Sequence, residues 1–195
     1  MTPAAIVLAG GRSKRMGQDK ASIPFCGRRM IDVVVDRVRA LSDRVIVCAR
    51  ATADLHPVDA HIIEDERSFA GPLPALIAGL RAAGTKRSVV VACDMPFLSV
   101  PLLAAIADRL DEEHDAVVPI TGDGPQPLHA AYGDCAIEPL LGALAAGERS
   151  LRGALDRLRV RWLEEDEWAS IEPSGRSFLN VNTLAELEAA AALEA

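Results

Sequence analysis

Residues 6–20, IVLAGGRSKRMGQDK, run from an apolar strand through a glycine turn into a cluster of cations. The opening IVLA is the kind of short apolar run that forms a buried strand. Gly10 and Gly11 then end the strand and leave backbone N–H groups with no side chain in front of them. Backbone N–H groups hydrogen-bond phosphate oxygens, while Arg and Lys neutralise their charge. The segment therefore predicts a polyphosphate-binding loop whose cations are Arg12, Lys14, Arg15 and Lys20.

The glycine spacing matches neither of the two common phosphate-binding templates. A P-loop carries Lys directly after its last glycine, whereas Gln18 follows Gly17 here. A dinucleotide fingerprint needs Gly-x-Gly-x-x-Gly, which Gly10, Gly11 and Gly17 do not form. A surface turn with solvated charges is therefore an alternative for these residues taken alone.

The composition excludes several classes of protein. Half of the 195 residues are hydrophobic, enough for the core of a single domain spanning residues 1–195. The net charge of −7 argues against a broad nucleic-acid-binding face. No apolar segment approaches the roughly 20 residues of a membrane span. The four cysteines are far apart, so we expect reduced thiols in a cytoplasmic protein with neither nucleic acid nor membrane as a partner.

Strand-like and helix-like segments alternate along the chain. Strands are expected at 6–9, 45–48, 61–64, 89–93, 116–120, 128–132, 160–163 and 178–181. Helices are expected at 30–41, 72–83, 101–110, 136–146, 150–158 and from 183 onward, with Ser99 and Ser150 as caps. Repeated alternation of this kind predicts a three-layer α/β/α domain with a mostly parallel, Rossmann-like sheet.

Two aspartates follow expected strands, where parallel sheets bind their ligands. Asp94 comes directly after the apolar run at 89–93, and a single rigid carboxylate suits Mg²⁺ that also takes phosphates and waters. A turn or cap aspartate before Pro96 is the alternative for this residue. Asp65 follows the strand at 61–64, although it also belongs to an acidic run that could be a solvated loop.

The string L-A-G-G-R-S-x-R-M-G-x-D-K resembles the N-terminal motif of nucleotidyltransferases that share the glycosyltransferase-A-like α/β fold. Within that group it looks most like the MobA family of molybdenum cofactor guanylyltransferases. Further strings resemble that family in order and spacing: C-D-M-P at 93–96, G-P-L at 71–73, Q-P-L-H-A-A-Y at 126–132, A-G-E-R-S at 146–150 and F-L-N-V-N-T at 178–183. The resemblance covers roughly residues 5 to 190.

The resemblance implies transfer of GMP from GTP to Mo-molybdopterin, which yields the guanine dinucleotide cofactor and pyrophosphate. It implies a GTP site formed by Leu8, Ala9, Gly10, Gly11, Lys20, Asp65 and Asp94. Arg15, Lys20 and Asp94 would be catalytic, and Asp94 would hold Mg²⁺. Besides GTP and Mo-molybdopterin, the expected partners are other molybdenum cofactor biosynthesis proteins and acceptor apoenzymes, in transient contacts.

Asn180 and Asn182 are the candidates for molybdopterin binding. On a strand at 178–181 they would point to the same face, where two amides could read a pterin or ribose. A pair of edge asparagines that satisfy loop backbone is the alternative. His129 is assigned no chemistry, because a lone histidine in a strand is more often structural than catalytic.

The sequence departs from the family at two positions. Ala75 stands where the family usually has glycine and could crowd a base or pterin, and Cys48 stands where the family often has asparagine. A molybdopterin cytidylyltransferase that uses CTP therefore stays open as an alternative. More distant alternatives are a sugar-phosphate nucleotidyltransferase and a non-catalytic molybdopterin carrier.

Overall fold

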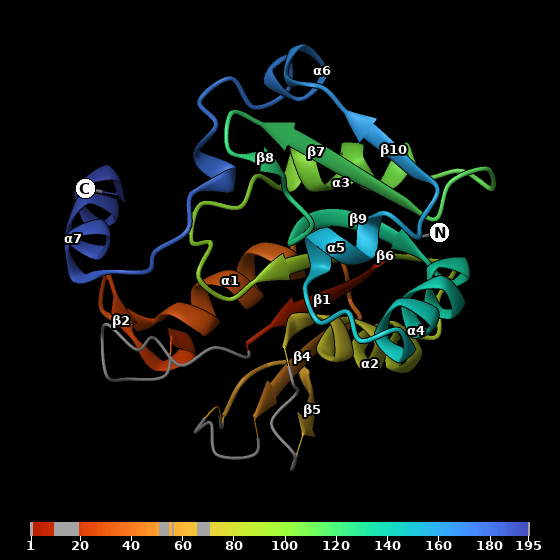
Figure 1. The fold of residues 1–195 in the computed structure, drawn as a ribbon. Coiled ribbons are helices and arrows are strands. Elements are labelled where there is room, and N and C mark those ends of the chain that lie inside the picture. The colour runs from red at the N-terminus through yellow and green to blue at the C-terminus, as the bar shows by residue number, and fades with distance from the viewer. Residues whose placement is uncertain (1, 10–19, 51–54, 56, 66–70, 195) are drawn as a thin grey trace.

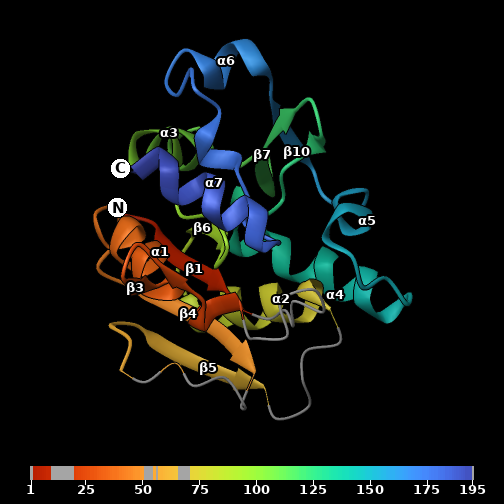
Figure 2. The same cartoon turned by 90° about the vertical axis from the view of Figure 1, so that its left-hand side faces the viewer.

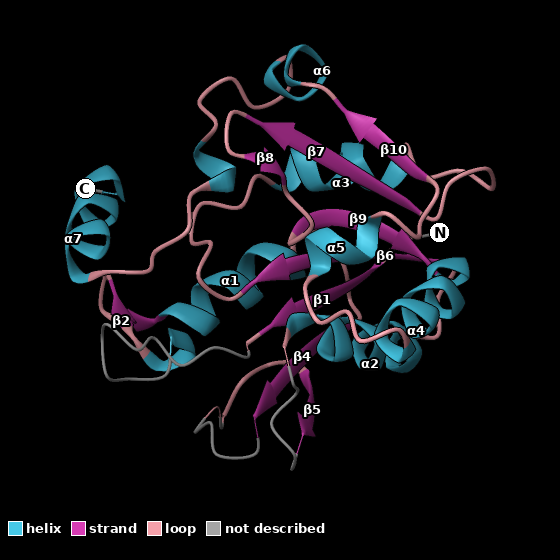
Figure 3. Cartoon of the chain, viewed as in Figure 1, coloured by secondary structure: helices cyan, strands magenta, loops and turns pink. Residues whose placement is uncertain are grey.

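The computed structural model describes residues 2–9, 20–50, 55, 57–65 and 71–194. Its main element is an eight-stranded sheet in the order β10-β7-β9-β6-β1-β4-β5, with β8 paired to β7 (Figure 3). The strands of this sheet are β1 Ala4–Leu8, β4 Val45–Arg50, β5 His61–Asp65, β6 Arg87–Ala92, β7 Ala116–Thr121, β8 Gly124–Pro125, β9 His129–Gly133 and β10 Val160–Leu163. A separate antiparallel hairpin is formed by β2 Pro24–Phe25 and β3 Arg28–Arg29.

Helices connect most of these strands. They are α1 Met30–Arg39, α2 Pro72–Ala83, α3 Val100–Asp108, α4 Ile137–Ala145, α5 Leu151–Leu155, α6 Glu165–Ala169 and α7 Leu184–Glu194, with short 3₁₀ turns η1 Lys20–Ser22, η2 Asp134–Ala136 and η3 Arg176–Phe178. Within the described ranges, no helix combines the length and apolar character needed to cross a membrane.

The sheet is mixed but mostly parallel, as the sequence predicts. β1 pairs in parallel with both β4 and β6, β4 pairs in parallel with β5, and β7 pairs in parallel with β10. Only β9 and the short β8 run antiparallel to their neighbours among the described strands of this sheet. The predicted α/β fold class is therefore confirmed.

Helices cover both faces of the sheet (Figure 1). α1 and α3 pack on one face in a cluster that includes Ala5 and Val7 of β1, while α2, α4 and α5 pack on the other face against Ala4, Ile6 and Leu8. Strands of a sheet that is buried on both faces are apolar throughout, which explains why β1 reads as a continuous apolar run. A ligand can reach this sheet only at its edges or ends.

The helix boundaries follow the capping signals in the sequence. The side chain of Ser99 accepts a hydrogen bond from the Leu102 N–H, and that of Ser150 accepts one from the Gly153 N–H. Gly71, the N-cap of α2, has a φ of +107°, and a Cβ there would lie 2.9 Å from the carbonyl oxygen of Arg149. Only glycine fits this backbone and this contact.

The predicted strand at 178–181 is wrong. Residues 176–178 form the 3₁₀ turn η3, and residues 179–183 form an irregular connection to α7. The Val181 N–H donates to the carbonyl oxygen of Asp94 at 2.9 Å instead of to a neighbouring strand. This tertiary hydrogen bond replaces the ladder that the apolar and β-branched residues of the segment suggested.

We call residues 176–183 the C-terminal connection. Ser177 lies at its start, fully buried, with its hydroxyl oxygen 2.6 Å from Nε2 of His129. The same oxygen accepts the N–H of Ser99 at 2.8 Å. The ring of Phe178 packs between those of His129 and Trp168, at centroid distances of 4.5 and 4.9 Å. These contacts bind the connection to β9, to the start of α3 and to α6.

α7 follows the connection and packs against the hairpin and α1 (Figure 2). Its contacts form a small apolar cluster whose buried members are Phe25, Met30, Val181 and Ala190. Arg37 of α1 adds an ion pair to Glu194 at 2.9 Å. The last helix is thus attached beside the sheet and contributes no layer to it.

Gly79 in α2 packs directly against β1 and β4. A Cβ at this position would lie 2.6 Å from Cγ2 of Ile6 and 3.0 Å from Sγ of Cys48. Gly79→Ala should therefore lower the free energy of unfolding by about 1–3 kcal/mol, because the helix must move away from the sheet. Urea unfolding followed by circular dichroism measures the change.

Gly142 provides the matched control, because it lies in α4 and a methyl group added to it would meet nothing within 4 Å. Gly142→Ala should raise the free energy of unfolding by about 0.5–1 kcal/mol through helix propensity. Equal effects of the two substitutions would contradict the close packing at Gly79.

The burial of His129 should make stability depend on pH. Burial lowers the pKa of His129 to about 4, whereas the ordinary value is 6.5. The unfolded chain takes up this proton at a higher pH than the folded chain, so the free energy of unfolding falls as the pH drops from about 6.5 toward 4. The contribution of His129 to this fall is about 2–3 kcal/mol between pH 7 and pH 4.5.

His129→Gln removes the titrating group and keeps a polar side chain. Urea unfolding at pH 7 and pH 4.5 should show a smaller loss of stability for the variant than for the wild type. An equal loss in both proteins would exclude His129 as a source of the acid sensitivity.

Candidate functional site

The carboxyl ends of four neighbouring strands meet at one edge of the sheet. β5, β4, β1 and β6 are adjacent and parallel, and in Figure 1 the arrowheads of β1 and β6 point to the side on which α7 lies. Figure 2 looks onto this edge, which we call the carboxyl edge. Open parallel sheets bind their ligands outside this edge, so it is the candidate functional site.

The end of β1 is held between its two neighbours. The Ala9 N–H donates to the Cys48 carbonyl at 2.8 Å, and the Leu8 carbonyl accepts the Cys93 N–H at 3.1 Å. Both Leu8 and Ala9 are buried. A contribution of these two residues to nucleotide binding would therefore use atoms other than this N–H and this carbonyl.

Several predicted residues of the nucleotide loop lie outside the described residues. This holds for Gly10, Gly11 and Arg15, and for the side chains of Lys20 and Asp65. The backbone of Lys20 begins η1, and Asp65 is the last residue of β5, paired with Arg50. The strands on either side therefore bring both ends of the loop region to the carboxyl edge.

Asp94 lies two residues beyond the end of β6 and is 8 % exposed. A carboxylate that is this buried at the end of a central strand has a fixed position. The described residues contain no cluster of three or more His, Cys, Asp or Glu side chains that could hold a metal ion. A lone carboxylate is nevertheless the donor set that Mg²⁺ uses when phosphates and waters supply its other ligands, so Asp94 fits such an ion.

The structure brings Asn180 and Asn182 next to Asp94. Both flank Val181, whose N–H is bonded to the Asp94 carbonyl. Asn180 is exposed, and its Nδ2 donates to the Phe178 carbonyl at 3.3 Å. The same-face argument for the two side chains no longer applies, since their segment is not a strand, yet they remain neighbours of the candidate metal ligand.

A cavity of about 310 Å³ lies beside this segment. Its lining combines aromatic rings, hydrogen-bonding groups and charges of both signs, from Thr121, Gly122, Asp123, Gln126, Arg152, Glu165, Trp168, Gly175, Phe178, Leu179 and Asn180. We call it the acceptor cavity. Of these residues, sequence patterns alone pointed only to Arg152 and Asn180, together with the turn at 122–125 and the Q-P-L-H-A-A-Y string.

Most of the Q-P-L-H-A-A-Y string has a structural role. Nε2 of Gln126 donates to Oγ1 of Thr121 at 2.8 Å and to the Gly124 carbonyl at 3.2 Å, which fixes the turn beside the acceptor cavity. The buried Tyr132 hydroxyl donates to the Pro127 carbonyl at 2.9 Å. Burial raises the pKa of Tyr132, so this hydroxyl stays protonated. The motif shapes the wall of the cavity from behind.

The two arginines of the A-G-E-R-S region differ in their surroundings. Arg149 donates from Nη1 to the carbonyls of Leu144 and Glu148, so its guanidinium folds back onto its own loop. Arg152 lines the acceptor cavity and donates from Nη2 to the Asp123 carbonyl at 3.0 Å. Of the two, Arg152 is therefore the better placed to meet an anionic ligand.

Both departures from the family pattern face the core. Cys48 is fully buried against α2, β4 continues two residues beyond it, and burial raises the pKa of its thiol to about 12. Ala75 is 3 % exposed and belongs to the same apolar cluster between the sheet and α2. The expected crowding by Ala75 and the expected lost contact at Cys48 therefore have no exposed side chain through which to act.

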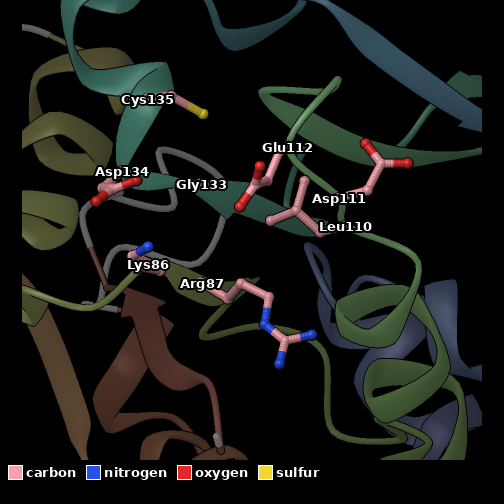
Figure 4. A pocket seen from close by; sticks show the side chains of 8 residues that line it. All are labelled: Lys86, Arg87, Leu110, Asp111, Glu112, Gly133, Asp134 and Cys135. Carbon is pink, nitrogen blue, oxygen red and sulfur yellow. The ribbon is translucent and has the colours of Figure 1, made fainter.

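Another cavity, of about 430 Å³, lies at the opposite edge of the sheet (Figure 4). It is lined at the start of β6 and the end of β9 by Lys86, Arg87, Leu110, Asp111, Glu112, Gly133, Asp134 and Cys135. This is the amino end of the parallel strands, and the loops that carry the predicted site residues do not reach it.

Comparisons with known proteins agree with this placement of the site. The sequence model of the family described as "MobA-like NTP transferase domain" matches residues 5–166. A molybdenum cofactor guanylyltransferase from Desulfosudis oleivorans is 35 % identical over 188 residues, which cover 96 % of this chain and 93 % of the relative. A probable molybdenum cofactor guanylyltransferase from Mycobacterium avium is 38 % identical over 199 residues, which cover 98 % and 96 %.

A solved structure is similar over nearly its whole length. It is the molybdopterin-guanine dinucleotide biosynthesis protein A from Archaeoglobus fulgidus, with a TM-score of 0.81, 28 % identity and coverage of 97 % of each chain. The sheet order, the position of Asp94 and these similarities lead to one conclusion: the chain belongs to the MobA-like NTP transferase family.

Proposed function

We propose that this chain is a molybdenum cofactor guanylyltransferase, which transfers GMP from GTP to Mo-molybdopterin and releases pyrophosphate. One observation carries the proposal beyond the family assignment. A buried aspartate at the carboxyl edge is hydrogen-bonded through Val181 to a segment that also lines the acceptor cavity. A nucleotide site and an acceptor site are thereby placed side by side, as a transferase requires.

The nucleotide half of the site is assigned to the ends of β1, β5 and β6. We propose that Leu8, Ala9, Gly10 and Gly11 bring backbone to the nucleotide, and that Asp65 contributes from the end of β5. Arg15 and Lys20 would neutralise the leaving pyrophosphate. The support for these roles is the sequence motif, together with the meeting of these strands at one edge.

Asp94 is the residue that would hold Mg²⁺. When bound there, the ion would neutralise charge on the phosphate oxygens of the substrates. The burial of Asp94 and the bond from Val181 to its carbonyl fix the carboxylate before any ligand arrives. Such preorganisation means that little rearrangement is needed during the reaction.

The acceptor half is assigned to the acceptor cavity and the adjoining asparagines. The amides of Asn180 and Asn182 would pair with polar groups of the pterin, while Arg152 would attract its phosphate. The aromatic rings of Trp168 and Phe178 form an apolar wall of the cavity. A cavity of this lining suits a ligand that is flat, polar at its rim and negatively charged at one end.

The reaction needs positioning more than it needs acid or base groups. The terminal phosphate oxygen of molybdopterin would attack the α-phosphate of GTP in line, forming one P–O bond as the bond to the β-phosphate breaks. The attacking oxygen is already anionic, so it requires no general base. Held in the two halves of the site, the substrates would react as if within one molecule.

The remaining assignments rest on sequence. We propose that residues 1–195 act as a single nucleotidyltransferase domain in the cytoplasm, a location with which the four free thiols agree. Transient contacts with molybdenum cofactor biosynthesis proteins and acceptor apoenzymes also belong to the proposal. A cytidylyltransferase activity is the alternative, although the buried side chains of Cys48 and Ala75 give it no specific support.

Asp94→Asn should reduce Mg²⁺-dependent turnover of GTP at least about a hundredfold, because the amide keeps the shape of the side chain and loses its charge. The melting temperature should stay close to that of the wild type. Asp108→Asn is the control, since Asp108 is 81 % exposed on the far end of α3 and should be neutral. Turnover by Asp94→Asn within threefold of the wild type would remove Asp94 from the site.

Binding of GTP, CTP, ATP and UTP in the presence of Mg²⁺ tests the choice of nucleotide. Calorimetry should show the tightest binding for GTP, and the dinucleotide product formed with Mo-molybdopterin should contain guanine. Preference for CTP would establish the cytidylyltransferase alternative. Absence of binding to all four nucleotides would favour the non-catalytic carrier.

A further inference from the structure

The buried pair Ser177–His129 is not used by the proposed mechanism. Both residues have no exposed surface, and the hydroxyl oxygen of Ser177 lies 2.6 Å from Nε2 of His129. The Ser99 N–H donates to the same oxygen at 2.8 Å. The start of the C-terminal connection is therefore joined by side-chain hydrogen bonds to both β9 and the first turn of α3.

The environment makes this pair selective for one arrangement. A buried hydroxyl and imidazole have no water to replace a lost partner, so each depends on the other for its hydrogen bond. Burial keeps the pKa of His129 at about 4, so the ring is neutral at physiological pH. Phe178, the next residue after Ser177, stacks against the same imidazole at a centroid distance of 4.5 Å.

A second attachment follows four residues later. The Val181 N–H is bonded to the Asp94 carbonyl at 2.9 Å, and the Glu186 carboxylate accepts the N–H groups of Asn182 and Thr183 at 2.6 and 3.1 Å. Only residues 178–180 lie between the two attachments, and they include Asn180 of the acceptor cavity. The positions of both asparagines are therefore set from the two ends of a short span.

We propose that Ser177 and His129 are positioning residues for the acceptor substrate, which hold Asn180 and Asn182 in register with Asp94. This inference rests on the proposed function, because it gives a role to residues that serve the acceptor half of that site. Neither residue needs to touch the substrate. The nucleotide half is built from β1, β4, β5 and β6, which the Ser177–His129 bond does not hold, so its affinity for GTP should be independent of the pair.

The kinetic test separates the two substrates. Ser177→Ala and His129→Leu should each raise the KM for Mo-molybdopterin about tenfold while the KM and Kd for GTP stay within about twofold of the wild type. His129→Gln places an amide near the position of Nε2 and should recover most of the lost acceptor affinity. Equal changes in both KM values, or no difference between His129→Leu and His129→Gln, would overturn the inference.

A surface variant keeps the test valid if the buried variants fold poorly. Glu186→Ala removes the second attachment at an exposed side chain and should raise the KM for Mo-molybdopterin, whereas Glu186→Gln retains a carbonyl acceptor and should not. Glu188→Ala, an exposed change on the same helix, is the control and should leave both KM values unchanged. An unchanged acceptor KM in Glu186→Ala would contradict positioning by the two attachments.

Amide hydrogen exchange provides a readout that does not depend on turnover. Ser177→Ala should speed exchange of the Val181 amide at least about tenfold while the amides of β1 and β6 exchange as in the wild type. An unchanged rate at Val181 would overturn the inference even if the enzyme is a guanylyltransferase. If instead the wild type fails to use GTP and Mo-molybdopterin, the proposed function fails, and the exchange result still reports whether Ser177 holds the segment.

Discussion

The pairing of β1 with β4 on one side and β6 on the other determines where every candidate site residue lies. β1 is central and buried on both faces, and its last backbone groups are bonded to Cys48 and Cys93. Because both pairings are parallel, three strand ends are brought to one edge. The apolar core therefore does more than stabilise the fold: it sets Asp94 and the two ends of the glycine-rich loop region within one crevice.

The other half of the site comes from a part of the chain that is not in the sheet. The C-terminal connection crosses the carboxyl edge and is bonded there to three separate elements, β9, the start of α3 and the turn after β6. Hydrogen bonds that link distant segments in a buried setting are costly to leave unmade, so they define a single path for the backbone. That path carries Asn180 from the acceptor cavity to the vicinity of Asp94.

The sequence predicted the fold class, the order of most helices and strands, and the location of Asp94, because apolar periodicity and capping serines act locally. It failed at 178–181, where the pattern of apolar residues fits a strand but the backbone partner is Asp94, far away in the chain. It also gave no reason to connect His129 with Ser177 or to expect the acceptor cavity. Those features depend on contacts between residues that are distant in sequence, which no local pattern reports.

The weak attachment of α7 has a consequence for how the site operates. Of the described residues of this helix, Ala190 alone is buried, and Leu184 and Leu193 are 64 % and 43 % exposed. Detaching this helix with part of the connection uncovers little apolar surface, so it is an inexpensive local opening of the structure. The asparagines assigned to the acceptor thus belong to the least stable part of the fold. Binding of the acceptor and ordering of this part are then coupled through one free energy, and the affinity measured for the acceptor includes the cost of closing the segment over it.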